Sequence, residues 1–183
     1  MYKLALYTFV TLFSATLVSA AEFVKPEKVY GRWAVNVDEN FCWISQIPIV
    51  GESKHERGGK SVPDNAVKRG EEYETVLSVV LEKGKEKPGY VYFTGGAYEF
   101  NTNEHTKFFL EIDGKQFTMK ASNLDGIGAS FSMGKDDTEI IELMIAGADA
   151  SVSSVSKRNL ISVDKFTLKD FTVSFRHAQK LCS

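Results

Sequence analysis

Short runs in which apolar and polar residues alternate recur through most of this sequence, and they constrain its fold more than any other feature. Such runs, separated by Gly, Pro, Asn or Asp, predict β-strands, because successive side chains of a strand point to opposite faces of a sheet. The expected strands are residues 29–37, 41–49, 73–81, 90–94, 108–112, 116–120, 151–155 and 160–168, with 129–133 as a further candidate. The chain is therefore expected to be built mainly from about eight short strands.

Two connections between these runs have a distinctive composition. Asp113-Gly114 stands between two alternating runs, and this dipeptide favours the tight type I′ turn of a β-hairpin. Residues 51–65 are polar and rich in glycine, with charges of both signs, so we expect an exposed loop or the tip of a long hairpin there.

The apolar spacing changes to that of a helix in two places, at about residues 136–147 and 170–181. The first has acids in its opening turn and a glycine at its end. The residues expected to face inward from the two helices are Ile140, Ile141, Met144 and Ile145, and Phe171, Phe175 and Ala178. The expected fold is therefore mainly β, an antiparallel β-sandwich or barrel decorated by two helices.

The N-terminus carries the pattern of an export signal. Lys3 precedes an apolar run over residues 4–18, and Val18-Ser19-Ala20 supplies small residues before a cleavage point. This layout predicts a secretory signal peptide over residues 1–20, because the apolar run is shorter than the roughly 20 residues that span a bilayer. The alternative is a permanent N-terminal anchor.

Residues 21–183 are expected to form one domain. The chain has 183 residues, of which 43% are apolar and 25% charged, as in an ordinary globular protein. The formal net charge of −2 gives neither the basic footprint of a nucleic-acid-binding protein nor a basic membrane-binding face.

The export signal indicates how the two cysteines, Cys42 and Cys182, should be interpreted. An exported chain enters an oxidising compartment, where an even number of cysteines usually indicates a disulfide. A Cys42–Cys182 bond would hold the C-terminal segment against an early strand. The alternative is a pair of buried free thiols.

The sequence offers no recognisable catalytic or metal site. The histidines are His55, His105 and His177, and none has metal-ligand spacing to another His or Cys, so we interpret them as surface residues and expect no metal or cofactor. A Gly-x-Ser-x-Gly motif is absent. The acids fall at expected turns and helix starts, where solvation or helix capping explains them. We therefore expect a protein that is not an enzyme.

Aromatic residues are the remaining candidates for a binding surface. Several of them surround Gly95-Gly96, and alternation would leave some of these rings exposed. The candidates for contact with a partner are Trp43, Tyr90, Tyr92 and Tyr98. The alternative is that these rings only pack the sheet.

Several short motifs follow one another along the chain after the export signal. They are Trp33-Ala34-Val35, Cys42-Trp43-Ile44-Ser45-Gln46 with Pro48, Lys68-Arg69-Gly70, Phe93-Thr94-Gly95-Gly96, residues 108–112, Lys165-Phe166-Thr167-Leu168, Phe171-Thr172 and Cys182. In this order the sequence resembles the invasion-associated locus B family of bacterial exported proteins.

The resemblance implies a compact β-rich domain outside the cytoplasm and a bond between Cys42 and Cys182. It also implies a link to host-cell entry, although similar chains occur in bacteria without an animal host. It carries over no catalytic residue. This sequence departs from the family in two ways: it lacks the second cysteine pair of many members, and Asp170 stands where small residues such as Gly are common.

Three functions follow as hypotheses. The first is a periplasmic or envelope-associated binding protein whose partner is an envelope or host protein or glycan. The second is an envelope hydrolase, which would need a pocket that joins acids to His105 or His177. The third is a purely structural protein of the envelope.

Overall fold

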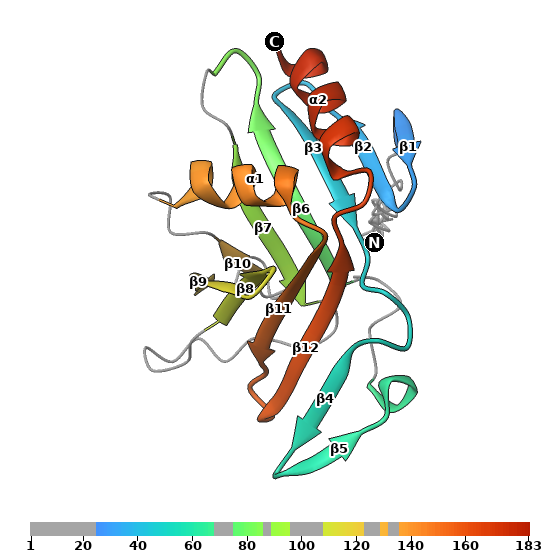
Figure 1. The fold of residues 1–183 in the computed structure, drawn as a ribbon, viewed down its shortest axis with the longest axis vertical. Coiled ribbons are helices and arrows are strands. Elements are labelled where there is room, and N and C mark those ends of the chain that lie inside the picture. The colour runs from blue at the N-terminus through green and yellow to red at the C-terminus, as the bar shows by residue number, and fades with distance from the viewer. Residues whose placement is uncertain (1–24, 68–74, 86–88, 96–107, 123–128, 132–135) are drawn as a thin grey trace, which may run out of the picture.

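The computed structural model describes residues 25–67, 75–85, 89–95, 108–122, 129–131 and 136–183. These residues form a mainly β domain with two α-helices, as expected (Figure 1). The strands are β1 (Lys28–Tyr30), β2 (Trp33–Val37), β3 (Phe41–Gln46), β4 (Lys54–Arg57), β5 (Lys60–Val62), β6 (Thr75–Glu82), β7 (Tyr90–Gly95), β8 (Phe108–Ile112), β9 (Lys115–Ser122), β10 (Ala129–Phe131), β11 (Asp149–Val155) and β12 (Leu160–Thr167). The helices are α1 (Asp137–Ala146) and α2 (Phe171–Cys182), with a single 3-10 turn, η1 (Asp64–Ala66).

The described strands pair antiparallel throughout, in the order β1-β2-β3-β6-β7-β10-β9-β8-β11-β12-β4-β5. Strand β9 pairs with β10 at the end of a first sheet, β1-β2-β3-β6-β7-β10, and with β8 at the start of a second, β8-β11-β12-β4-β5. Within the described residues the order runs from one edge, β1, to another, β5, without closing. Of the two expected architectures, the structure therefore shows the sandwich.

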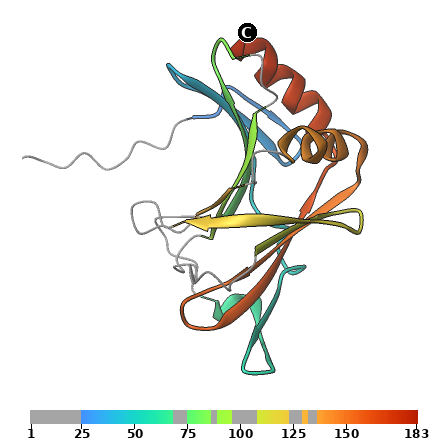
Figure 2. The ribbon, with the colours of Figure 1, turned by 90° about the vertical axis from the view of Figure 1, so that its left-hand side faces the viewer.

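Both helices lie on the same face of the first sheet (Figure 2). Helix α2 packs over β2 and β3, and α1 lies against β7 and β8. Burying these apolar faces is the main stabilising term, at roughly 1.5–3 kcal/mol for each large side chain removed from water. The buried aromatic and aliphatic side chains at the centre are Trp33, Ile44, Leu77, Phe93, Phe108, Leu110, Met144, Phe166, Phe171 and Phe175.

Aromatic contacts join the layers of this core. The Trp33 and Phe171 rings, from β2 and α2, meet edge to face with centroids 5.0 Å apart. Phe93 of the first sheet meets Phe166 of the second in the same geometry at 6.3 Å. The sheets and α2 thus share one core.

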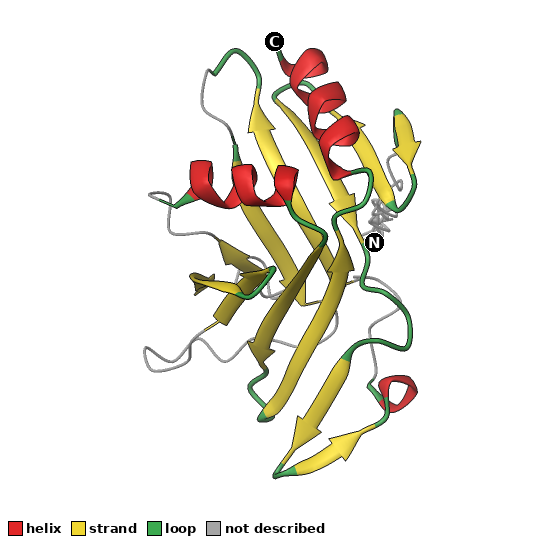
Figure 3. Ribbon diagram, viewed as in Figure 1, coloured by secondary structure: helices red, strands yellow, loops and turns green. Residues whose placement is uncertain are grey.

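Local sequence signals located several elements correctly. The turn at Asp113-Gly114 joins β8 to β9, and both residues have the positive φ angles, 45° and 86°, that a type I′ turn requires. The two α-helices, drawn in red with the 3-10 turn in Figure 3, begin and end within one residue of the expected 136–147 and 170–181. Phe171, Phe175 and Ala178 are buried, as the spacing predicted.

Two further segments form hairpins: the prediction of one strand over residues 29–37 was wrong, whereas residues 51–65 agree with the hairpin alternative. Residues 29–37 form a hairpin, β1–β2, because the chain turns at Gly31, whose φ is +56°. Residues 51–65 contain the hairpin β4–β5, and Gly58 and Gly59 provide its two positive φ angles. These hairpins raise the described strands to twelve.

Helix α1 also differs from the expectation at both of its ends. Ile145 is 39% exposed and does not share the buried stripe of Ile140, Ile141 and Met144. Asp136 stands at the N-cap but makes no side-chain capping bond. The Asp137 carboxylate instead accepts a hydrogen bond from the backbone N–H of Val91 in β7. Asp137 therefore ties α1 to the sheet, and the Asp136 side chain does not cap the helix.

Candidate functional site

The predicted disulfide is present. Cys42 and Cys182 are bonded, with Cα atoms 5.8 Å apart across a sequence separation of 140 residues, so the free-thiol alternative is wrong. Cys42 lies on the helix-covered face of β3, and Cys182 is at the end of α2. The Gly84 N–H, from the turn after β6, donates to the Cys182 carbonyl at 3.2 Å. The bond therefore fixes the end of α2 to the sheet.

A hydrogen-bond joint holds the end of β12, shortly before α2, to the first sheet. The Gln46 side-chain amide pairs with the backbone of Thr167: Nε2 donates to the carbonyl and Oε1 accepts from the N–H, each at 3.0 Å. The Trp33 indole N–H donates to the same carbonyl at 3.1 Å. Trp33, Gln46 and Thr167 all belong to the motifs that carry the family resemblance. In this structure these residues join the first sheet to β12.

The joint continues the pairing of β12 where its neighbouring strand ends. Strand β4 pairs with β12 only over residues 160–163, and the Ile49 N–H then donates to the Lys165 carbonyl at 2.8 Å. Gln46 supplies the next pair of bonds with its side chain. Because the contact spans 121 residues, Gln46 stood out in the sequence only as part of a motif, and nothing in the sequence indicated its bonds to Thr167.

Three of the four candidate aromatic residues lie on one face of the first sheet. Trp43 is opposite Val80, and Val80 is opposite Tyr90, so the three form a row across β3, β6 and β7. Tyr92 follows on the same face of β7. Tyr98 lies outside the described residues. Trp43, Val80, Tyr90 and Tyr92, which we call the aromatic face, are all half-buried.

The aromatic face lies on the side of the sheet opposite the helices. Cys42 precedes Trp43 in β3 and points to α2, so alternation directs Trp43 away from it. Trp33, by contrast, is fully buried beneath α2. The two tryptophans of neighbouring strands therefore lie on opposite faces of the sheet, Trp33 in the core and Trp43 half-buried.

The chemistry of the aromatic face is that of uncharged rings with polar groups beside them. Asn36 is opposite Trp43, and Ser78 is opposite Tyr92. Burial, and secondarily the negative charge of Glu82, raise the pKa of the Tyr90 phenol above its ordinary value of 10.0. Tyr90 therefore remains a neutral phenol at physiological pH. Because Asn36 and Ser78 are buried, at 7% and 6% exposed, the half-buried rings are the accessible part of this face, and they suit stacking rather than ion pairing.

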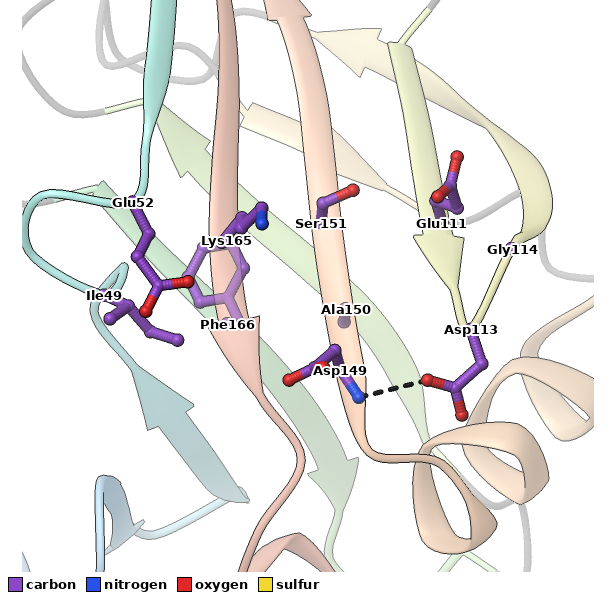
Figure 4. A pocket seen from close by; sticks show the side chains of 10 residues that line it. All are labelled: Ile49, Glu52, Glu111, Asp113, Gly114, Asp149, Ala150, Ser151, Lys165 and Phe166. Atoms are coloured by element: carbon purple, nitrogen blue, oxygen red, sulfur yellow. Dashed lines mark hydrogen bonds between the residues drawn. The ribbon is translucent and has the colours of Figure 1, made fainter.

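A pocket of about 270 Å³ opens on the second sheet. Its walls come from β8, β11, β12 and the segment after β3 (Figure 4). Four carboxylates line it, those of Glu52, Glu111, Asp113 and Asp149, together with Lys165. Asp113 has a structural role, because its carboxylate accepts the backbone N–H groups of Ala148 and Asp149 at 3.1 and 3.2 Å.

Neither of the two described histidines, His55 and His177, lines this pocket. His177 of α2 is half-buried, with Nδ1 2.8 Å from the Tyr30 hydroxyl. His55 was expected to be a surface residue, and this was wrong: it is buried in β4, with Nδ1 2.9 Å from the Ser162 hydroxyl. His105 lies outside the described residues. The pocket therefore does not join its acids to His177, as the hydrolase hypothesis required.

The described parts of the chain contain no cluster of three or more His, Cys, Asp or Glu side chains placed to hold a metal ion. Nor does any described helix combine the length and apolar character needed to cross a membrane. Comparisons with models of protein families, with curated proteins and with solved structures found no match to this chain.

Proposed function

We propose that this chain is an exported, envelope-associated binding protein, related to the invasion-associated locus B family, that contacts a protein or glycan partner. The observation that carries the proposal is the row Trp43, Val80 and Tyr90 on the side of the sheet opposite both helices. Trp and Tyr dominate the energetics of protein interfaces because each offers a large, rigid surface with a polar edge.

Three features support the export part of the proposal. Residues 1–20 have the layout of a signal peptide, and the Cys42–Cys182 bond is compatible with an oxidising compartment. The motifs that resemble the family include both cysteines. Contact with a host cell is the finer role that the resemblance suggests.

Several residues of the motifs that resemble the family have structural roles in this fold. Trp33, Gln46 and Thr167 belong to one joint, and Cys42 and Cys182 form one bond. Residues with these roles maintain the fold, and the proposal assigns them no contact with a partner. The proposed binding surface rests on Trp43, which belongs to the same motifs, and on Tyr90, which does not.

The test is a pull-down with the oxidised chain, immobilised and exposed to envelope extracts and to purified envelope glycans. Trp43→Ala should weaken retention of the partner about tenfold or more, as expected for an aromatic residue central to an interface. Ile161→Ala is the matched control, because Ile161 is an exposed apolar residue on β12, away from the aromatic face.

Both variants should retain the disulfide and the β-sheet circular dichroism signal of the parent chain. Equal retention by Trp43→Ala and Ile161→Ala would remove the aromatic face as the binding surface. Recovery of no partner from either source would contradict the binding function itself.

A further inference from the structure

The two halves of α2 are held to the sheet in different ways. From Phe171 to Ala178 the helix buries Phe171, Ser174, Phe175 and Ala178. After Ala178, Gln179 and Lys180 are exposed and Leu181 is only half-buried. The apolar packing that holds the helix therefore largely ends one turn before the helix does.

The last turn depends instead on the disulfide. Cys182 is its one buried residue, and it is buried because it is bonded to Cys42 in β3. Around this bond, the Gly84 N–H donates to the Cys182 carbonyl at 3.2 Å, the Cys182 Sγ lies 3.5 Å from the Leu81 carbonyl, and half-buried Leu181 packs against the core. Helix ends fray readily, because their last carbonyls lack partners within the helix.

In this structure the last turn of α2 covers a strip of the first sheet. Cys42 is fully buried, and Leu81, opposite Cys42 in β6, is 5% exposed. Val37, opposite Cys42 in β2, packs against the same core. Opening of this turn would uncover apolar surface without disturbing Trp33 and Phe171 at the far end of the helix.

We propose that residues 179–183 form a redox-dependent latch. A dithiol reductant transfers two electrons to the Cys42–Cys182 bond, which breaks to give two thiols, while the reductant becomes a disulfide. The last turn of α2 then opens from the sheet, and residues 171–178 stay docked. Oxidation by a disulfide reverses both changes and closes the strip.

The experiment uses the full chain, reduced with excess dithiol and then freed of it. Iodoacetamide labelling of Cys182 and Cys42, followed by mass spectrometry, measures the opening rate as urea is raised. Local opening should label both thiols at least about tenfold faster than global unfolding allows, with little dependence on urea. Labelling that follows global unfolding over the whole urea range would overturn the latch.

Hydrogen exchange gives an independent measure on the same sample. Reduction should abolish protection of the amides of residues 180–183, while the Phe175 amide keeps its protection. Unchanged protection at residues 180–183 would also overturn the proposal.

A pair of variants adds a control within the same turn. Leu181→Ala removes the half-buried side chain and should speed labelling, whereas Gln179→Ala changes an exposed position and should not. Equal labelling rates for the two variants would show that the turn opens only with the whole fold.

Discussion

The side chain of Gln46 takes the place of a strand beside Thr167, bonding both its N–H and its carbonyl at 3.0 Å. Gln46 is 2% exposed, so water cannot replace these bonds when they are lost. The Trp33 indole N–H shares the Thr167 carbonyl. This joint makes the relative placement of β3 and β12 depend on one amide.

The joint predicts a pH-dependent effect of Gln46→Glu. At pH 7 the carboxylate can accept from the Thr167 N–H but faces its carbonyl without a donor, and we expect a loss of about 2–3 kcal/mol in the free energy of unfolding. Burial raises the pKa of such a carboxyl in the folded chain, so the loss should shrink as pH falls towards 4 and the protonated form donates again.

Urea denaturation at pH 7 and pH 4 checks this prediction. Gln179→Glu, the same change at an exposed position of α2, is the control and should alter stability by less than about 0.5 kcal/mol. An equal loss at both pH values would show that the bond to the Thr167 carbonyl is not the cause.

Gly31 and Asp170 should be energetically coupled. Gly31 has a φ of +56°, and a Cβ there would clash with the carboxylate of Asp170, a residue that itself has a φ of +65°. We expect Gly31→Ala to cost about 1–3 kcal/mol, partly recovered when Asp170→Gly removes the opposing side chain.

A thermal or urea double-mutant cycle measures the coupling. Gly84→Ala is the control, since Gly84 has a φ of +69° but no atom within 4 Å of a new Cβ, so it isolates the backbone cost of about 1 kcal/mol. Additive effects of Gly31→Ala and Asp170→Gly would contradict the steric explanation.

The raised pKa of Asp137 predicts that its contribution to the free energy of unfolding falls as pH rises. Burial, and secondarily the charge of Asp136, raise its pKa above the ordinary value of 3.8 despite the bond from Val91. The folded chain therefore holds this proton more tightly than the unfolded chain, and the contribution of Asp137 to stability falls as pH rises through the folded pKa. Asp137→Asn should be more stable than the parent at pH 7.

The neutral amide oxygen of that variant can still accept the Val91 N–H. The advantage of Asp137→Asn should diminish below about pH 4, where the parent carboxyl is also neutral. Chemical denaturation of both chains from pH 3 to pH 8 tests this, and a variant that is less stable at pH 7 would contradict it.

Removal of the disulfide should destabilise the chain strongly. The loop closed between Cys42 and Cys182 is long, and the chain-entropy estimate for it is about 5 kcal/mol, of which measured gains usually reach about 2–4 kcal/mol. Replacing both cysteines with Ala should lower the free energy of unfolding by about 2–4 kcal/mol. Urea midpoints unchanged from those of the oxidised parent would contradict it.

The local features of the sequence predicted the local structure well. Alternation located most of the strands, Asp113-Gly114 gave the β8–β9 turn, and helical spacing placed α1 and α2 within a residue of their ends. These features are set by the backbone geometry of a few neighbouring residues. The bonding of Cys42 to Cys182 followed from composition, because no other cysteine is present.

The packing and pairing of elements distant in the sequence decided which side chains are buried and which residues join the sheets. Trp33 and Trp43 have similar local surroundings, yet only the position of α2 makes one fully buried and leaves the other on the opposite face. His55 is buried because β4 pairs with β12, and Gln46 matters only because Thr167 arrives beside it. Such contacts depend on strand order, which the alternation of side chains along one strand does not encode.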